Sequence, residues 1–204
     1  MSGATHLAVG MAACFAVFQP NTIEEVTLCI GVSSIGGILS DIDVDSSAAR
    51  KKTEKVVGIT LLLVLLAVAA NWKFRLGIEK IILEDMGLLR LFLGFAGLAA
   101  ICMYGMEQPH RTFMHSISAV LLTAGACWLL SPKLVPYMIL SMSAHIILDL
   151  FNKKRVQVFY PFRWKACLGL CKADGLVNSI LLGLSSVMIA VQLFQSVLRI
   201  LGMA

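Results

Sequence analysis

Two residues near the end of a long apolar run carry the first chemical signal in this chain. His145 and Asp149 are four positions apart, so on a helix both side chains lie on one face. A charged carboxylate inside a membrane helix is costly unless it is paired or coordinated. The spacing fits three arrangements: two ligands of one metal ion, a hydrogen-bonded structural pair, or a proton relay.

A second candidate is the turn Asp41-Ile42-Asp43, which follows another apolar run directly. Two carboxylates so close together repel each other, and a divalent cation between them removes that cost. The alternative is a turn whose carboxylates are only hydrated. Asp45 lies farther from the run and is the weaker candidate ligand.

A polar island at residues 107–116 separates two further apolar runs and contains His110, Arg111 and His115. A guanidinium beside imidazole ligands suits an anionic oxygen, either of a phosphate or of a developing oxyanion. The alternative for Arg111 is an anchor at the lipid head groups. His110 follows a proline and is expected behind the ligands or in solvent, whereas the fourth histidine, His6, begins an apolar run.

Composition indicates the scaffold that must position these residues. The chain has 204 residues, of which 58% are hydrophobic and 14% charged, and its mean hydropathy is +0.86. A soluble domain carries about 25% charged residues, so an integral membrane protein is predicted. The six cysteines suggest no disulfide framework, and Cys167 and Cys171 lack the second Cys or His pair of a zinc site. The N-terminus shows no basic leader or cleavage site, so the first apolar run is expected to stay in the mature protein.

The predicted fold is all-α, a polytopic membrane bundle of about six or seven helices that forms a single domain over residues 1–204. Apolar runs cover residues 3–18, 26–40, 56–72, 88–106, 117–130, 134–151 and 175–201, and the amphipathic stretch 73–87 is expected at the membrane interface. The first two runs are short for a hydrocarbon layer of about 30 Å. They are therefore expected to tilt, to cross incompletely or to be extended by buried polar residues.

Counting crossings along these runs places all four histidines and the aspartates at the same membrane face. The segments on that side carry eleven of the seventeen Lys and Arg residues, so the positive-inside rule predicts that the site faces the cytoplasm. The net charge of +5 is read as a signal of orientation, and no nucleic-acid partner is expected.

Histidine and carboxylate ligands together suit a divalent metal, zinc first, with manganese or iron as alternatives. Such a metal would activate water for attack on an ester. A site at the membrane face beside the aromatic loop 159–164 would suit an amphiphilic substrate, so a phospholipid or a lipid-linked phosphoester is the expected class.

The chain also resembles a known family. Thr5-His6 with Gly10, Asp41-Ile42-Asp43, the stretch 110–116, and the stretch 143–164 occur in the order seen in YdjM-type inner-membrane proteins, over about residues 4–167. The resemblance implies a bacterial membrane-bound metal-dependent hydrolase associated with the SOS regulon, distantly similar to zinc-dependent phospholipase C and nuclease P1. It implies metal ligands at His6, Asp41, His115, His145 and Asp149, with Asp43 close behind, and it matches Arg111 and Ser116 to the family's Arg and Ser positions.

The chain departs from the family pattern around these positions. Ser40 stands where a proline usually precedes the aspartates, Thr112 replaces a glycine and Met114 a threonine, and Lys154-Arg155-Val156 replaces the usual Gly-Val. These changes surround the expected ligands and leave the ligands themselves in place.

The resulting hypothesis is attack by metal-activated water on a lipid-associated phosphoester. Asp43 or a free ligand carboxylate would act as the base, Arg111 would hold the phosphate, and Ser116 is included as a catalytic position through the family match. Two alternatives stay open: an ion- or proton-coupled transporter that uses the same His and Asp residues, and a non-catalytic membrane scaffold in a stress response. Sequence alone leaves the substrate and the oligomeric state open.

Overall fold

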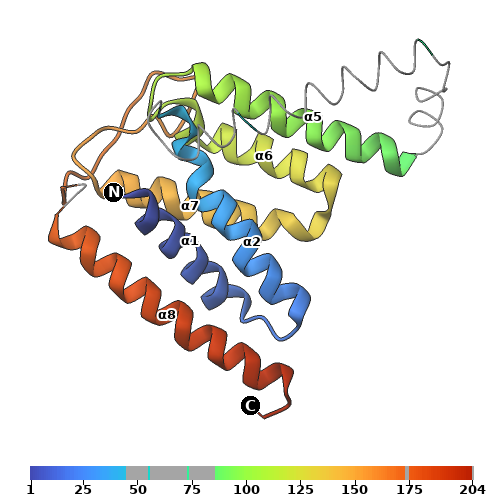
Figure 1. Ribbon diagram of the computed structural model, residues 1–204. Coiled ribbons are helices and arrows are strands. Elements are labelled where there is room, and N and C mark those ends of the chain that lie inside the picture. The colour runs from blue at the N-terminus through green and yellow to red at the C-terminus, as the bar shows by residue number, and fades with distance from the viewer. Residues whose placement is uncertain (45–54, 56–72, 74–85, 173–174, 204) are drawn as a thin grey trace.

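A computed structural model describes residues 1–44, 55, 73, 86–172 and 175–203, and these residues form a helical bundle (Figure 1). The long helices are α1 (Gly3–Phe18), α2 (Ile23–Leu39), α5 (Met86–Glu107), α6 (Ile117–Leu130), α7 (Val135–Phe151) and α8 (Leu176–Ile200). Three short 3₁₀ helices join them: η1 (Ser40–Asp43), η2 (Phe113–His115) and η3 (Pro132–Leu134). The all-α prediction is confirmed. The expected span at 56–72, the basic loop before it and most of the amphipathic stretch 73–87 lie outside the described residues.

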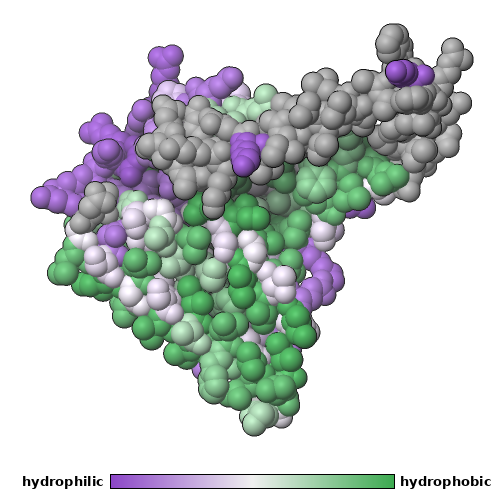
Figure 2. Space-filling model, viewed as in Figure 1, coloured by the Kyte–Doolittle hydropathy of each residue, from purple (hydrophilic) through white to green (hydrophobic). Residues whose placement is uncertain are grey.

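Among the described residues, four helical stretches are long and apolar enough to cross a membrane: Ile23–Asp43, Met86–Glu107, Pro132–Phe151 and Leu176–Ile200. Two apolar helices, Gly3–Phe18 and Ile117–Leu130, are shorter. On the face shown in Figure 2, hydrophobic residues dominate the lower part of the bundle, and hydrophilic residues are densest at the end where α5 and α7 finish. This distribution suits an apolar surface in contact with lipid and a polar end outside it.

The start of α2 differs from the sequence-based expectation. The helix begins at Ile23, three residues before the predicted start of the apolar run at 26. Thr22 caps it by accepting a hydrogen bond from the Glu25 backbone N–H, and the Glu25 carboxylate accepts one from the Asn21 N–H. Acidic residues in a first turn also interact favourably with the helix dipole, so polar residues extend this helix beyond its apolar part.

Small residues let α1, α2 and α7 approach closely. A Cβ added at Gly10 would lie 2.5 Å from the Ser141 Oγ, and one at Gly37 would lie 3.0 Å from the His6 carbonyl oxygen. The Ser141 hydroxyl donates to the Ser33 carbonyl at 2.5 Å. Small residues at helix interfaces are the usual means of close packing in membranes, and here they bring the site-bearing ends of three helices together.

The polar face of α7 is turned into the bundle. Tyr137, Ser141, His145 and Asp149 follow one another at intervals of four residues, and all four are buried. The last turns of α7 lie at the same end of the bundle as the starts of α1 and α6 and the ends of α2 and α5 (Figure 1). The 3₁₀ helix η1 follows α2 at this end, so polar residues from several helices come together there.

The segment 152–172 connects α7 to α8 at the polar end and is not helical. Val156 and Ala166 exchange backbone hydrogen bonds of 2.8 and 2.9 Å, and the Leu168 N–H donates to the Leu150 carbonyl at 2.7 Å. The segment therefore folds back onto the end of α7, where it lies against the site described next.

Candidate metal centre

Five side chains from four parts of the chain meet at the polar end. We call them the His/Asp cluster: His6 from α1, Asp41 from η1, His115 from η2, and His145 and Asp149 from α7. The donor atoms of His6, His145 and Asp149 lie within 4.8 Å of one another, and so do those of Asp41, His115 and His145. These are the five residues for which the family resemblance implies metal ligation.

His145 is oriented by the backbone of α2. Its Nδ1–H donates to the Gly37 carbonyl at 2.7 Å, which fixes the tautomer and leaves the Nε2 lone pair available. Nε2 then lies 3.5 Å from the Asp41 Oδ1. A histidine that donates one ring nitrogen to a backbone carbonyl and offers the other to an ion is the usual arrangement in metal sites.

His115 also has an oxygen acceptor, a carboxylate, close to one ring nitrogen. Its Nδ1 lies 3.3 Å from the Asp43 Oδ2. On the other side of the ring, Nε2 lies 3.2 Å from the Asp149 Oδ2 and 3.8 Å from the Asp41 Oδ1. Asp43 thus lies behind His115 and outside the set of donors that face one another.

His6 completes the set of three imidazoles. Its ring stacks on that of His145 with centroids 3.6 Å apart and an angle of 14° between the planes. Its Nε2 lies 3.4 Å from the Asp149 Oδ1. Two imidazoles that lie parallel at this distance cannot both carry a charge cheaply, so at least one of them is expected to be neutral and able to bind a metal.

The first turn of α1 is held by α8. Asn178 Oδ1 accepts hydrogen bonds from the Thr5 hydroxyl at 2.8 Å and from the Ser2 backbone N–H at 2.9 Å. Thr5 is fully buried and directly precedes His6. Sequence analysis did not identify Asn178. The available signal was an amide side chain in the first turn of an otherwise apolar helix.

Arg111 is buried and connects the cluster to the 152–172 segment. Its Nη2 donates to the Asp149 Oδ1 at 3.1 Å, and its Nη1 donates to the Lys154 carbonyl at 2.8 Å. Its backbone has φ 65°, the left-handed region. The Asn152 amide also donates to the Asp149 Oδ1 at 2.8 Å. The N-terminal amine of Met1 donates to the same oxygen at 3.5 Å, so three protein donors hold Oδ1, while Oδ2 is the oxygen close to His115.

Asp43 collects three contacts of its own. It accepts hydrogen bonds from His110 Nδ1 at 2.8 Å and from the Arg111 backbone N–H at 3.1 Å, in addition to its contact with His115. The His110 ring also meets the His115 ring edge to face, with centroids 5.0 Å apart, so His110 borders the cluster on the solvent side. The donor atoms of Asp43, His110 and His115 also lie within 4.8 Å of one another.

Ser116 caps helix α6. Its hydroxyl donates to the Phe113 carbonyl at 2.6 Å and accepts from the Ala119 backbone N–H at 3.2 Å. The side chain is fully buried. Its hydrogen-bonding capacity is used by the turn that places His115. The catalytic assignment of Ser116 stays a prediction, and a capping role accounts for the residue type.

Electrostatics favour a cation at the cluster. The Nε2 atoms of His115 and His145 are buried and make no well-formed hydrogen bond within the described part of the chain. Burial alone would lower the pKa of His115, but the nearby carboxylates of Asp149 and Asp43 outweigh it and raise the pKa to about 9. Imidazole nitrogens without a partner, beside carboxylates, suit a divalent ion with nitrogen and oxygen ligands.

Asp41 marks the open side of the cluster. Its side chain is 20% exposed, whereas those of His115 and His145 are 0% exposed. Nearby, Asp43, Glu107 and His110 line an open hollow of about 600 Å³. A water molecule or a substrate would therefore approach from the side of Asp41 and His110.

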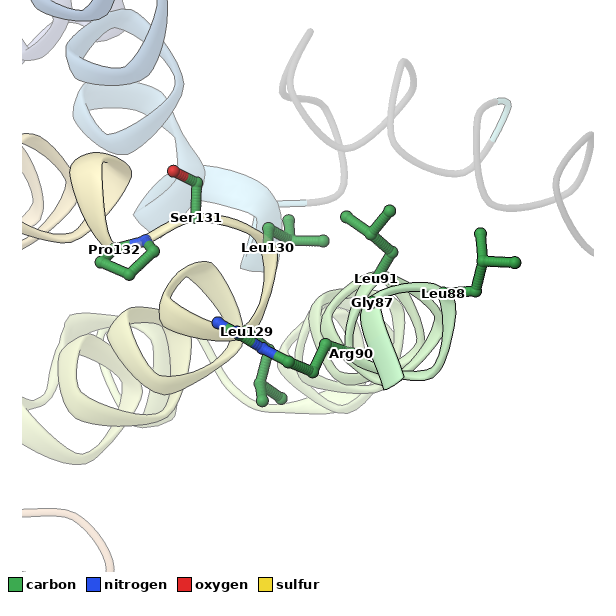
Figure 3. Close-up of a pocket in the computed structure, with 8 residues that line it drawn as sticks. All are labelled: Gly87, Leu88, Arg90, Leu91, Leu129, Leu130, Ser131 and Pro132. Carbon is green, nitrogen blue, oxygen red and sulfur yellow. The ribbon is translucent and has the colours of Figure 1, made fainter. Parts of the chain in front are cut away.

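A different hollow, of about 530 Å³, lies between the start of α5 and the end of α6 (Figure 3). Its apolar lining includes Leu88, Leu91 and Leu130, and the Arg90 guanidinium lies 5.4 Å from the centre of the Trp128 ring. It contains no residue of the His/Asp cluster.

Cys171 is likewise apart from the cluster, with its thiol directed at the Phe151 carbonyl.

A family model described as YdjM inner membrane protein matches residues 1–203. No curated protein and no solved structure matches.

Proposed function

The chain belongs to the YdjM inner membrane protein family, and we propose that this multi-pass membrane protein is a metal-dependent hydrolase of lipid-associated phosphoesters. The observation that carries the proposal is the orientation of the cluster. His115 and His145 each have one ring nitrogen beside a fixed oxygen acceptor, and each directs the other nitrogen at the aspartates that share the site.

The cluster would hold the ion through His6, Asp41, His115, His145 and Asp149. Nitrogen and carboxylate donors without thiolates suit zinc, and manganese or iron as alternatives. Bound there, the ion would lower the pKa of a water molecule and polarise the phosphoester. The ligands come from segments that only the folded bundle brings together, so binding should stabilise the fold.

The surrounding residues have roles that follow from their contacts. Arg111 contacts the proposed ligand Asp149 directly, so its guanidinium would supply positive charge for a phosphate. Asp43 orients His115 and accepts from His110, which borders the open hollow. The exposed His110 imidazole would take a proton from water on that side and pass its Nδ1 proton to Asp43. Asp43 would thus act as the base, with His110 as the relay.

The location of the site suits a lipid substrate. The cluster lies at the end of the candidate span Pro132–Phe151, and the exposed aromatic side chains of Phe159, Phe162 and Trp164 lie on the segment that follows that span. We propose that this end faces the cytoplasm, as the distribution of Lys and Arg predicts.

The transporter alternative would need a polar path across the bundle. Polar residues do continue along α2 and α7 from the cluster, at Ser33 and Ser141. Their hydroxyls, however, donate to the backbone carbonyls of Cys29 and Ser33. This pattern favours close helix packing over an ion path.

The test measures metal first and turnover second. Elemental analysis of detergent-purified protein should find stoichiometric metal in the wild type and in His110→Ala, and loss of metal in His145→Ala and Asp41→Ala. Metal-loaded wild type should then release a fluorophore from a labelled phospholipid, and the two metal-free variants should not. A wild type that takes up neither zinc nor manganese on reconstitution would refute the hydrolase proposal, and a structural His–Asp network would remain.

A further inference from the structure

The 152–172 segment combines a set of cations with a set of exposed apolar side chains. Its sequence contains six Lys and Arg residues and no Asp or Glu. Its exposed large hydrophobic residues are Phe159, Phe162, Trp164, Leu168 and Leu170. Phe162 is 73% exposed and Leu170 71% exposed. In water, such exposure in an ordered segment is unfavourable, so this surface is built for contact with something apolar and anionic.

The position of the segment identifies the apolar partner. It begins where the candidate span Pro132–Phe151 ends and leads to the span Leu176–Ile200. Backbone hydrogen bonds from Leu168 to Leu150 and from Leu170 to Phe151 hold it against the end of α7. A segment held at the ends of two spans lies at the height of the lipid head groups. Aromatic side chains favour that layer, where their rings can be partly buried among the lipids.

Charge identifies the lipid. Across the part of the chain that the structure describes, none of the cationic side chains of this segment forms an ion pair. Cations at the membrane surface attract anionic lipid head groups, whereas zwitterionic head groups offer no net charge to bind. Lys153, Arg163 and Lys165 are all exposed, so they can reach head groups beside the inserted aromatic rings.

We propose that the 152–172 segment is a docking surface for anionic phospholipid, with Phe162, Trp164 and Leu170 inserted among the lipids and Lys153, Arg163 and Lys165 on the head-group phosphates. The Arg111 side chain connects this surface to the His/Asp cluster, through the Lys154 carbonyl on one side and Asp149 on the other. Anionic lipid would thus be concentrated at the entrance of the site. Its further role as substrate rests on the proposed function, whereas the docking itself does not.

Trp164 provides a direct readout. The chain has three tryptophans, Trp72, Trp128 and Trp164, so Trp72→Phe with Trp128→Phe leaves Trp164 as the only indole. This protein would be reconstituted with chelator into zwitterionic vesicles that contain a brominated lipid, either phosphatidylglycerol or phosphatidylcholine, at equal mole fraction. Brominated lipid quenches tryptophan on contact. We expect the anionic lipid to quench Trp164 at least about twofold more than the zwitterionic lipid.

Two charge variants complete the experiment. Lys153→Gln, Arg163→Gln and Lys165→Gln together should abolish the preference for the anionic lipid while quenching by the zwitterionic lipid persists, which shows that Trp164 still lies in the interface. Arg90→Gln, Lys133→Gln and Arg199→Gln together remove the same charge elsewhere and should leave the preference unchanged.

Equal quenching by the two lipids would overturn the assignment of anionic lipid. Absence of quenching by both would overturn the docking surface and point to a soluble partner. Because the chelator prevents metal-dependent turnover, either result leaves the hydrolase proposal to its own test.

Discussion

Gly37→Ala should weaken metal binding although it changes no proposed ligand. A Cβ at this position would lie 3.0 Å from the His6 carbonyl oxygen and 3.0 Å from the Leu7 Cα. Both neighbours are backbone atoms, so the contact is relieved only if α1 and α2 move apart. Overpacking of this kind costs about 1–3 kcal/mol. The same movement would separate His6 from His145, whose Nδ1 is bonded to the Gly37 carbonyl. Loss of such orienting contacts costs about 10–100-fold in metal affinity.

The control is Gly31→Ala on the same helix. A Cβ at Gly31 would have no neighbour within 4 Å. The substitution there should therefore only stabilise helix α2, by about 1 kcal/mol, because alanine has a higher helix propensity than glycine. Metal affinity, measured by competition with a fluorescent chelator in detergent, should be unchanged in Gly31→Ala and reduced in Gly37→Ala. Without metal, Gly37→Ala should also melt at a lower temperature than Gly31→Ala. Equal metal affinities in the two variants would refute the argument that the α1–α2 distance determines the geometry of the site.

Three further predictions concern the surroundings of the cluster. Metal affinity, measured by chelator competition at a series of pH values, should rise about tenfold per pH unit between about pH 7 and pH 9 and then level off. The reason is that the pKa of His115 is raised to about 9, so below that pH metal binding must release the proton of His115. An affinity independent of pH would contradict this. Asn178→Ala should lower metal affinity severalfold by freeing the first turn of α1, while the exposed Ser179→Ala should not, and equal affinities would show that α8 does not position His6. Ser116→Ala should cost about 1 kcal/mol of stability through loss of the α6 cap but retain metal and turnover; abolished turnover with normal metal content would instead establish the catalytic role matched from the family.

Local spacing predicted part of the site. His145 and Asp149 had to share a face because α-helical geometry fixes positions four apart, and the structure places both side chains in the cluster. The crossing count also placed the histidines at one end, because apolar runs that traverse a membrane must alternate in direction. Both arguments depend only on helix geometry and on hydropathy, which a sequence shows directly.

The spacing of Asp41 and Asp43 in the sequence does not show which histidines each carboxylate contacts. Both follow α2, and only the 3₁₀ turn of η1 determines that Asp41 faces His145 while Asp43 faces His110 and His115. The same holds for Asn178, whose partners are more than 170 positions away in the chain. Contacts of this kind arise from tertiary packing, and residue type alone does not reveal them.

The hydrogen bond between His145 and Gly37 spans 108 positions of the chain, and this separation has a consequence for how the protein is made. During synthesis, α1 and α2 with His6 and Asp41 are made before the imidazole and the carboxylate of α7. The α1–α2 hairpin alone therefore cannot form the cluster. Metal uptake would then follow insertion of α7, so occupancy would distinguish fully assembled molecules from partly inserted ones.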